Sequence, residues 1–370
     1  MNKIKKVALG LVITIALILV GVIIWDGAFL STRYDISKDY YDDEKELMTE
    51  TQFKLIRAGI QAASSHNMQP WKVKIQDQKT FQLYADMKKT LPVIDPDNAQ
   101  HLMSQGTFIG SVKEAAQALG VKLNVTYSEV ELSEEVPLIA TFTIVEDTTS
   151  SIDAISSATK GIIGEVSSFD FEEAMMLIDE VSSDFNTVWI KEDQKAQLQE
   201  YLRKGTLIES NNQAAVEELL EIFRFSKWEK NKYRYGLSLN TMQPIIRTFI
   251  EPVIGFTANW ESFGDSSIGV FEQRLEDESI YLVISKETPA PIDYIQVGEV
   301  TTRLGLGING YMARPAVQLL QPLEGMTEVK DQMKNDFRVN GTPMLILGFT
   351  KTTDSYHESL RHNVMDIIID

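Results

Sequence analysis

A short polar loop, SSHNMQP, is the segment whose residue types are best suited to chemistry. Its side chains bring hydrogen-bond donors and acceptors together, and Pro70 restricts the backbone that carries them. Groups of this kind fix the orientation of a bound organic ligand. Ser, Asn and Pro are also common turn residues, so a plain helix stop followed by a turn is the alternative. The candidate ligand contacts are Ser64, Ser65, Asn67 and Gln69.

The longer stretch AASSHNMQPW, from Ala62 to Trp71, resembles the flavin-binding loop of the nitroreductase superfamily. With histidine before asparagine, it is most similar to the Acg-type nitroreductase-like branch. The resemblance extends to the helix at Gly106, the helix start at Gly298, the strand at Pro343 and the terminal SLRHNV. The loop is its specific part, and Trp71 is expected to anchor the following strand in the core.

The resemblance implies an α+β fold in which two halves of one chain clasp FMN at their junction. It places Ser64, Ser65, Asn67 and Gln69 at the edge of the isoalloxazine ring, which presents N3–H, N5 and two carbonyls. His66 would donate to a flavin oxygen or close the loop onto its neighbours. The implied activity moves hydride from NAD(P)H or another donor, through the flavin, to a nitro, quinone or similar acceptor. No general acid is evident.

The FMN phosphate needs basic contacts, and here the chain departs from the family pattern. Typical members begin with paired arginines and a serine, whereas the first helix here offers Arg57. A second contact usually comes from a basic residue near the C-terminus, where Arg361 matches best and Lys351 is the reserve. The arginine that often follows the Pro343 strand is absent. We expect Arg57 and Arg361 at the phosphate, with ordinary surface charges as the alternative.

An uncharged apolar segment, VALGLVITIALILVGVIIW, runs from Val7 to Trp25. As a helix it would be about 28 Å long, roughly the thickness of a bilayer's hydrocarbon core. Lysines precede it and acidic residues follow it, so the positive-inside rule predicts a single-pass anchor with a cytoplasmic N-terminus and an extracytoplasmic domain. A cleaved signal peptide is the alternative, although its apolar stretch is normally only about 7–15 residues long. The flanking charges are Lys3, Lys5 and Lys6 before the segment, and Asp26, Asp35, Asp39, Asp42, Asp43 and Glu44 after it.

The remaining chain divides into an acidic juxtamembrane stalk, 26–45, and a folded domain, 46–370, with halves of about 46–215 and 216–370. Two stretches that open at Gly106 and Gly298 each enter a small-residue helix and lead to an apolar strand, which suggests two related α+β halves. We predict helices at Leu47–Ala63, Ser104–Leu119, Val297–Met312 and Ser359–Ile369, and strands at WKVKIQ, TFQLYAD, VKLNVTY, PLIATFTIV, ESIYLVIS and TPMLILGF.

Composition narrows the function classes. The chain has 53 acidic and 35 basic residues, which argues against a general affinity for nucleic acid. It has no cysteine, so disulfides, thiolate nucleophiles and cysteine-ligated metals are excluded. The histidines show no metal-ligand spacing, and no metal is expected. They are His66, His101, His357 and His362.

Two further sequence patterns could indicate a binding site, but each also has a purely structural explanation. Gly305, Gly307 and Gly310 spell G-x-G-x-x-G, but they fall inside a predicted helix and indicate close helix packing rather than a dinucleotide site. The segment Arg224 to Tyr235, RFSKWEKNKYRY, interleaves basic and aromatic residues. It could meet a phosphate, a membrane surface or a flavin, since an inserted segment covers the flavin in the Acg branch, or it could be a solvated helix face with aromatic anchors.

The sequence leaves three functions open. The first is the membrane-anchored, FMN-dependent oxidoreductase already described, pseudo-dimeric within one chain and thus able to act as a monomer. The second is a protein that binds or stores flavin without turnover, because an outward domain lacks a ready supply of NAD(P)H. The third is a surface interaction protein with a degenerate pocket.

Overall fold

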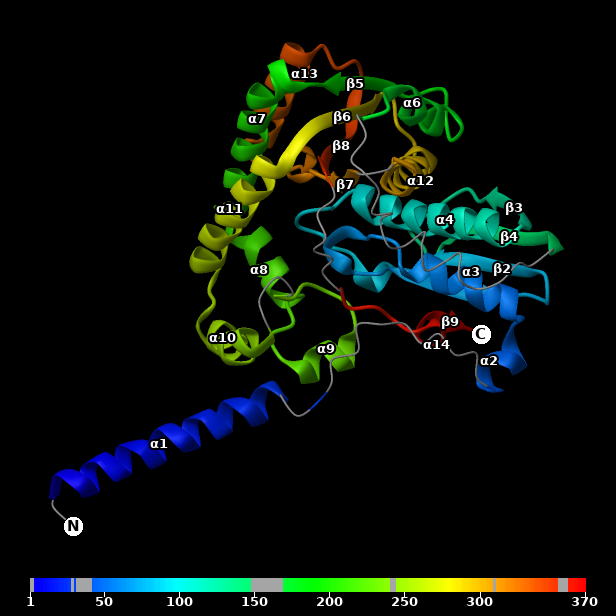
Figure 1. Cartoon of the computed structure of the whole chain (residues 1–370). Helices are drawn as coiled ribbons and strands as arrows, with labels where there is room; N and C mark the ends of the chain where they lie inside the picture. Colours follow the sequence, from blue (N-terminus) through cyan, green and yellow to red (C-terminus); the bar gives the residue numbers. More distant parts are fainter. Residues whose placement is uncertain are drawn as a thin grey trace.

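The computed structural model describes residues 3–27, 30, 42–147, 169–239, 244–308, 311–351 and 359–370. It contains two separate β-sheets surrounded by helices, with one apolar helix projecting from the rest (Figure 1). The prediction of an α+β chain preceded by an apolar N-terminal helix is confirmed.

The projecting helix is α1 (Lys3–Asp26), which ends where Gly27 adopts a φ of 72°. In the described part of the chain, it is the one helix long and apolar enough to cross a membrane, a test that a signal sequence also passes. Most of the predicted stalk lies outside the described residues; its last positions begin the short helix α2 (Asp42–Leu47).

The first sheet has the strand order β3-β4-β2-β1-β9. Strands β1 to β4 pair antiparallel, and the short C-terminal β9 pairs parallel with β1. Trp71 is fully buried at the start of β1, as expected. The predicted strands are confirmed as β1 (Trp71–Ile75), β2 (Thr80–Ala85), β3 (Val121–Tyr127) and β4 (Leu138–Asp147), and the return strand is β9 (Ile368–Ile369).

Two helices pack against this sheet, and local capping sets their ends. Helix α3 (Glu50–Ile60) starts after Thr49, whose side chain forms a capping box with Gln52, so the predicted helix Leu47–Ala63 is shorter and separate from α2. Helix α4 (Ala99–Leu119) starts five residues before the predicted Ser104 and ends at Gly120, which has a φ of 70° and caps the helix as expected.

The second sheet has the order β5-β6-β8-β7, and all its strands pair antiparallel. The chain enters this sheet at β5, before the half boundary expected near residue 215. A long helical insertion then separates β5 from β6. The strands are β5 (Asn186–Ile190), β6 (Glu278–Lys286), β7 (Tyr311–Pro315) and β8 (Thr342–Lys351).

The helices of this second part precede, interrupt or follow those strands. Helix α6 (Phe171–Asp179) precedes β5, α12 (Pro291–Gly307) joins β6 to β7, and α13 (Met326–Phe337) lies between β7 and β8. The insertion consists of α7 (Glu192–Ser210), α8 (Gln213–Glu221), α9 (Lys227–Tyr233), α10 (Pro244–Thr257) and α11 (Trp260–Asp277).

Helices α4 and α12 lie between the two sheets and pack closely against each other (Figure 1). A Cβ atom on Gly106 would stand 1.8 Å from the carbonyl oxygen of Ile295, and one on Gly298 would stand 1.9 Å from that of Met103. Only glycine permits such backbone contact. The two glycines that open the similar stretches of sequence therefore meet each other in space.

Two predicted helices need correction. The helix Val297–Met312 is wrong at both ends, because α12 starts six residues earlier, at Pro291, and stops at Gly307, while Met312 belongs to β7, where it pairs with Thr350 of β8. The helix Ser359–Ile369 is wrong over most of its length: only α14 (Val364–Ile367) is helical. Its predicted last turn instead pairs with β1, and its predicted first turn bonds to the SSHNMQP loop, as described below.

The glycines of α12 confirm the prediction that they permit close packing of a helix. Gly305 and Gly307 are helical, and a Cβ on Gly307 would meet Leu177 of α6 at 2.7 Å. Gly310 lies outside the described residues. A dinucleotide-binding turn is thus contradicted by the position of these glycines within a helix.

Candidate functional site

The SSHNMQP loop connects α3 to β1 and contains the single-turn helix η1 (Ser65–Asn67). Its backbone is unusual, because His66, Asn67 and Gln69 have φ angles of 46°, 56° and 48°. Non-glycine residues rarely adopt this left-handed conformation unless surrounding contacts hold them there. One such contact runs within the loop, where the Gln69 backbone N–H donates to Ser64 Oγ at 3.0 Å.

Gln69 is fully buried and fastens two distant segments to the loop. Its Nε2 donates to the carbonyl oxygens of Arg234 at 2.9 Å and Leu360 at 3.0 Å. Its Oε1 accepts the backbone N–H of His362 at 2.9 Å. Both side-chain N–H groups are used, so Gln69 serves the protein's own structure in this conformation.

Asn67 repeats this pattern beside it. Its Nδ2 donates to the carbonyl oxygens of Gly236 at 3.2 Å and Leu360 at 3.1 Å. Its Oδ1 accepts from Arg361 Nη1 at 2.6 Å. Together Asn67 and Gln69 therefore form an amide clasp that holds two chain segments, 234–236 and 360–362, against the loop.

The two arginines assigned to a phosphate lie near the C-terminal end of α3. Arg57 is in the last turn of that helix and is partly buried. Arg361 donates to Asn67 and to its neighbour's carbonyl oxygen, and its Nη2 lies 3.5 Å from the carbonyl oxygen of Gln61, which caps α3. Lys351, the reserve, is exposed at the end of β8.

The side chains of Ser64, Ser65 and His66 make fewer hydrogen bonds to described residues than those of Asn67 and Gln69. Ser65 Oγ donates to Gln100 Oε1 at 2.9 Å, and the Ser64 hydroxyl accepts one bond while donating none among the described residues. The His66 ring makes no hydrogen bond within the described chain. Burial lowers its pKa to about 4, so its imidazole is neutral at pH 7 and can offer one donor and one acceptor.

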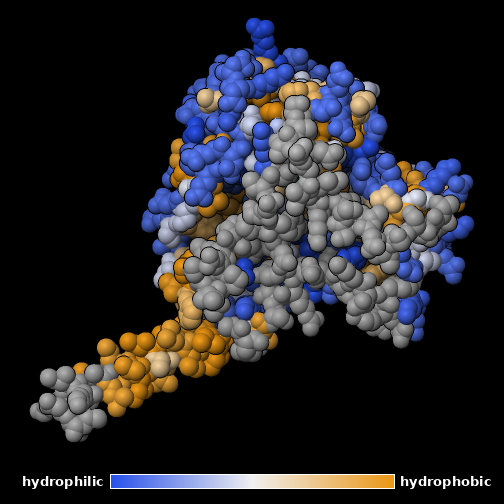
Figure 2. All heavy atoms as spheres, viewed as in Figure 1, coloured by the Kyte–Doolittle hydropathy of each residue, from blue (hydrophilic) through white to orange (hydrophobic). Residues whose placement is uncertain are grey.

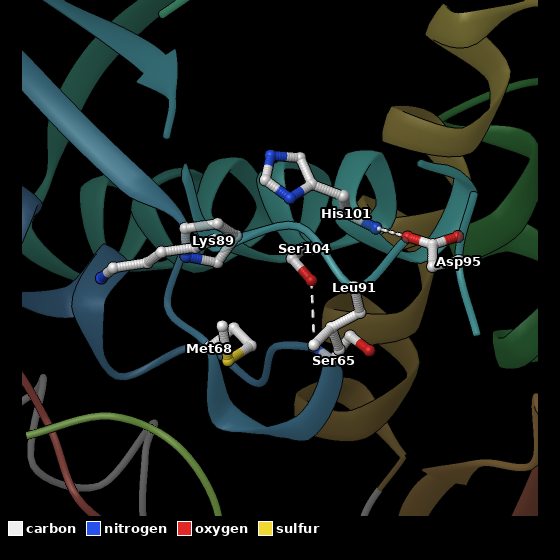
Figure 3. A pocket seen from close by; sticks show the side chains of 8 residues that line it. Ser65, Met68, Lys89, Leu91, Asp95, His101 and Ser104 are labelled. Carbon is white, nitrogen blue, oxygen red and sulfur yellow. Dashed lines mark hydrogen bonds between the residues drawn. The ribbon is translucent and has the colours of Figure 1, made fainter. Parts of the chain in front are cut away.

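A small cavity separates the loop from α4 (Figure 3). Its volume of about 10 Å³ suits a single water molecule. Ligand pockets usually measure roughly 300 Å³ or more, so this cavity cannot admit an isoalloxazine ring. It is lined by Ser65, Met68, Pro70, Lys89, Leu91, Asp95, His101 and Ser104.

Three titratable groups in this lining have shifted pKa values. Burial lowers the pKa of Lys89 to about 8, and its Nζ donates to the carbonyl oxygen of Gln69 at 3.1 Å and to His362 Nε2 at 2.8 Å. Burial raises the pKa of Asp95 to about 6, and burial lowers that of His101 to about 4. His101 Nε2 is buried without a hydrogen-bond partner in the described part of the chain.

Sequence reasoning did not single out Lys89 or Asp95. The available signal was the position of Asp95 just before a helix, where a carboxylate commonly accepts backbone N–H groups. Asp95 accepts those of Gln100 at 3.0 Å and His101 at 2.9 Å, which explains the early start of α4. No such local signal marks Lys89, because tertiary packing alone brings it to the loop.

The basic and aromatic segment 224–235 proves to be mainly internal. Arg224 is buried with its guanidinium 4.3 Å from the Tyr233 ring centroid, and Lys230 is paired with Glu251. Arg234 Nε donates to the carbonyl oxygen of Arg361 at 2.7 Å. A solvated helix face is therefore wrong for these three cations. The segment lies between β5 and β6, so it is part of the chain that builds the second sheet. It does not link the chain of the first sheet to that of the second.

The described residues contain no group of three or more histidine, aspartate or glutamate side chains that could hold a metal ion. The chain matches no protein-family model, and no curated protein is significantly similar to it. The loop and the fold must therefore support any functional conclusion.

Proposed function

We propose that this chain is a membrane-anchored, nitroreductase-like flavoprotein built from two related α+β halves, with FMN held near their junction. The main supporting observation is topological. The first sheet reads β3-β4-β2-β1 before the added β9, and the second reads β7-β8-β6-β5. In each sheet, counted in chain order, a helix precedes the first of these four strands and a central helix lies between the second and the third.

The same correspondence pairs α3 with α6 and α4 with α12, which meet at Gly106 and Gly298. The halves then run from about α2 to β4 and from α6 to β8, with α7 to α11 inserted into the second. The C-terminal segment returns to the first sheet through β9. The loop's resemblance likewise implies two halves of one chain that meet at a junction.

The fit of this loop to FMN is partial. Asn67 and Gln69 are poor candidates for ring contacts, because their polar atoms already form the amide clasp. The Ser64 hydroxyl and the neutral His66 ring keep hydrogen-bonding capacity and are the groups we assign to the flavin. When bound, FMN would supply hydride-transfer chemistry. The protein would supply a rigid loop, held by the clasp, and neutral donors.

The second candidate function is flavin binding without turnover. It is favoured by the protonation states of the titratable side chains in and beside the loop. A general acid works best with a pKa near the operating pH. His66 and His101 have pKa values of about 4, so both are neutral at pH 7 and neither carries the acidic proton of an imidazolium. Lys89 has a pKa of about 8, but its ammonium already donates to the loop and to His362.

FMN titration of the full chain in mild detergent tests the assignment. We expect Ser64→Ala and His66→Ala each to weaken FMN binding by roughly fivefold to a hundredfold, as one lost hydrogen bond in a buried site would cost about 1–3 kcal/mol. Ser266→Ala on α11 is the matched control, because that serine is exposed and, among the described residues, its hydroxyl bonds only within its own helix. Equal FMN affinity in all three variants would remove Ser64 and His66 from the site. Reduction by NAD(P)H then separates the enzyme from the non-turnover protein.

A further inference from the structure

Helix α10 carries an apolar stripe on its outer face. Phe249, Val253 and Phe256 are 41%, 56% and 72% exposed. Their spacing of four and three residues places them on one side of the helix. The opposite side carries Glu251, which is buried and paired with Lys230 of α9. This polarity is the reverse of a water-facing helix, whose apolar side packs inward and whose charges face out.

The stripe is continuous with the apolar surface of α1. The rings of Trp25, at the end of α1, and Phe256 are 5.0 Å apart between centroids. A Cβ on Gly255 would stand 3.2 Å from the Trp25 ring, so α10 packs beside the last turns of α1 (Figure 1). In Figure 2, the apolar surface of α1 runs onto the adjoining part of the domain.

Helix α9 adds a residue suited to a membrane–water boundary. Trp228 is 49% exposed, and its Nε1 donates to the carbonyl oxygen of Ile24 at 3.2 Å. That carbonyl belongs to the last turn of α1 and also accepts the backbone N–H of Gly27 at 3.2 Å. Tryptophan is enriched at membrane interfaces because its ring is apolar and its N–H is polar. Lys232, exposed on the same helix, suits the headgroup layer.

We propose that α10 and the adjoining Trp228 lie in the interfacial layer of the lipid bilayer that α1 spans, at the C-terminal end of α1. The buried Lys230–Glu251 pair joins α9 to α10 and keeps both charges away from the lipid. The domain thus contacts the membrane a second time, beside the end of α1. This inference rests on α1, α9 and α10 and is independent of flavin binding.

Site-specific fluorescence can test this contact, because the chain has no cysteine of its own. Val253→Cys and Phe256→Cys would each be labelled with nitrobenzoxadiazole and the full chain reconstituted into phosphatidylcholine–phosphatidylglycerol vesicles. Met176→Cys on α6, at a site 60% exposed, is the control. We expect the labels on α10 to emit at shorter wavelength and to lose intensity when the lipids carry acyl-chain nitroxides, while the label on α6 is unaffected.

Two results would overturn the proposal. If the α10 labels emit like the α6 label and are not quenched by nitroxide lipids, the stripe faces water. If their emission is shifted without lipid quenching, a protein rather than the bilayer covers it. Unfolding curves that match the wild type confirm that the labelled chains are folded, and the two independent α10 sites guard against a local effect of either label.

Discussion

Replacing Gln69 with alanine tests whether the amide clasp is structural. The side chain is fully buried and makes three hydrogen bonds to backbone groups. Without it, the carbonyl oxygen of Arg234 loses the bond from Nε2 and the N–H of His362 loses the bond to Oε1. The carbonyl oxygen of Leu360 keeps its bonds from Asn67 and Arg361. The variant therefore leaves two backbone groups without these partners.

The magnitude follows from those two groups. Losing a hydrogen bond from a buried group costs about 1–3 kcal/mol, so the two groups together cost about 4 kcal/mol at the middle of that range. The variant avoids ordering a glutamine side chain, which offsets up to about 2 kcal/mol of this cost. We expect Gln69→Ala to lower the free energy of unfolding by about 2–4 kcal/mol. Urea unfolding of the full chain in mild detergent, followed by tryptophan fluorescence, measures this loss.

Gln213→Ala is the matched control. The Gln213 side chain is exposed and, within the described part of the chain, bonds only to Glu217 in its own helix, so its loss should change stability by less than about 0.5 kcal/mol. Equal stability of the two variants would refute the clasp. If Gln69→Ala instead abolished FMN binding at unchanged stability, Gln69 would be a ligand contact, as the family resemblance implies.

Three further predictions concern packing, pH and topology. Gly106→Ala and Gly298→Ala should each destabilise the chain by more than about 3 kcal/mol in urea unfolding, because their Cβ atoms would lie within 2 Å of carbonyl oxygens. His101→Gln should flatten the pH dependence of stability between about pH 4 and 6.5, by about 3 kcal/mol in total. Protease added to intact cells should digest the domain, because the flanking charges of α1 predict an extracytoplasmic location.

Each of these three predictions has a control variant or an outcome that would contradict it. Gly269→Ala, which has none of the described atoms within 4 Å of its Cβ position, should be neutral or slightly stabilising in α11. The pKa of His101 in the folded state lies below the unfolded value of 6.5. Its contribution to the free energy of unfolding is therefore fully present above pH 6.5 and is lost as the pH falls towards about 4. A wild-type-minus-variant difference that grows on acidification would contradict this sign. Digestion only after lysis would place the domain in the cytoplasm.

Local patterns in the sequence were sufficient for much of the fold. Alternating apolar residues predicted β1 and β2, and other short apolar runs predicted β3, β4, β6 and β8. Gly120 marked the end of α4 because its C-cap position needs a positive φ. Gly106 and Gly298 stood out as the first residues of two similar stretches of sequence, although the structure places both inside their helices rather than at a helix start. Their mutual contact needs the three-dimensional structure, since it joins residues far apart in the chain.

The errors arose where tertiary contacts override local preference. Residues 359–369 have no local feature that forbids a helix, yet the His362 N–H bonds to Gln69 and Ile368 pairs with Val73. Asn67 and Gln69 were predicted as flavin contacts from their polarity and from the resemblance of the loop to a flavin-binding loop. Their engagement by carbonyl groups from residues 234–236 and 360 could not be inferred from the loop itself.

The visible absorption spectrum of the full chain, purified in mild detergent and supplied with FMN, tests the central claim most directly. We predict the bands of oxidised flavin in the protein fraction after unbound FMN is removed, at a stoichiometry near one per chain. The bound flavin should be released as FMN on denaturation. A colourless protein that takes up no FMN would contradict the flavoprotein proposal and favour a surface interaction protein with a degenerate pocket.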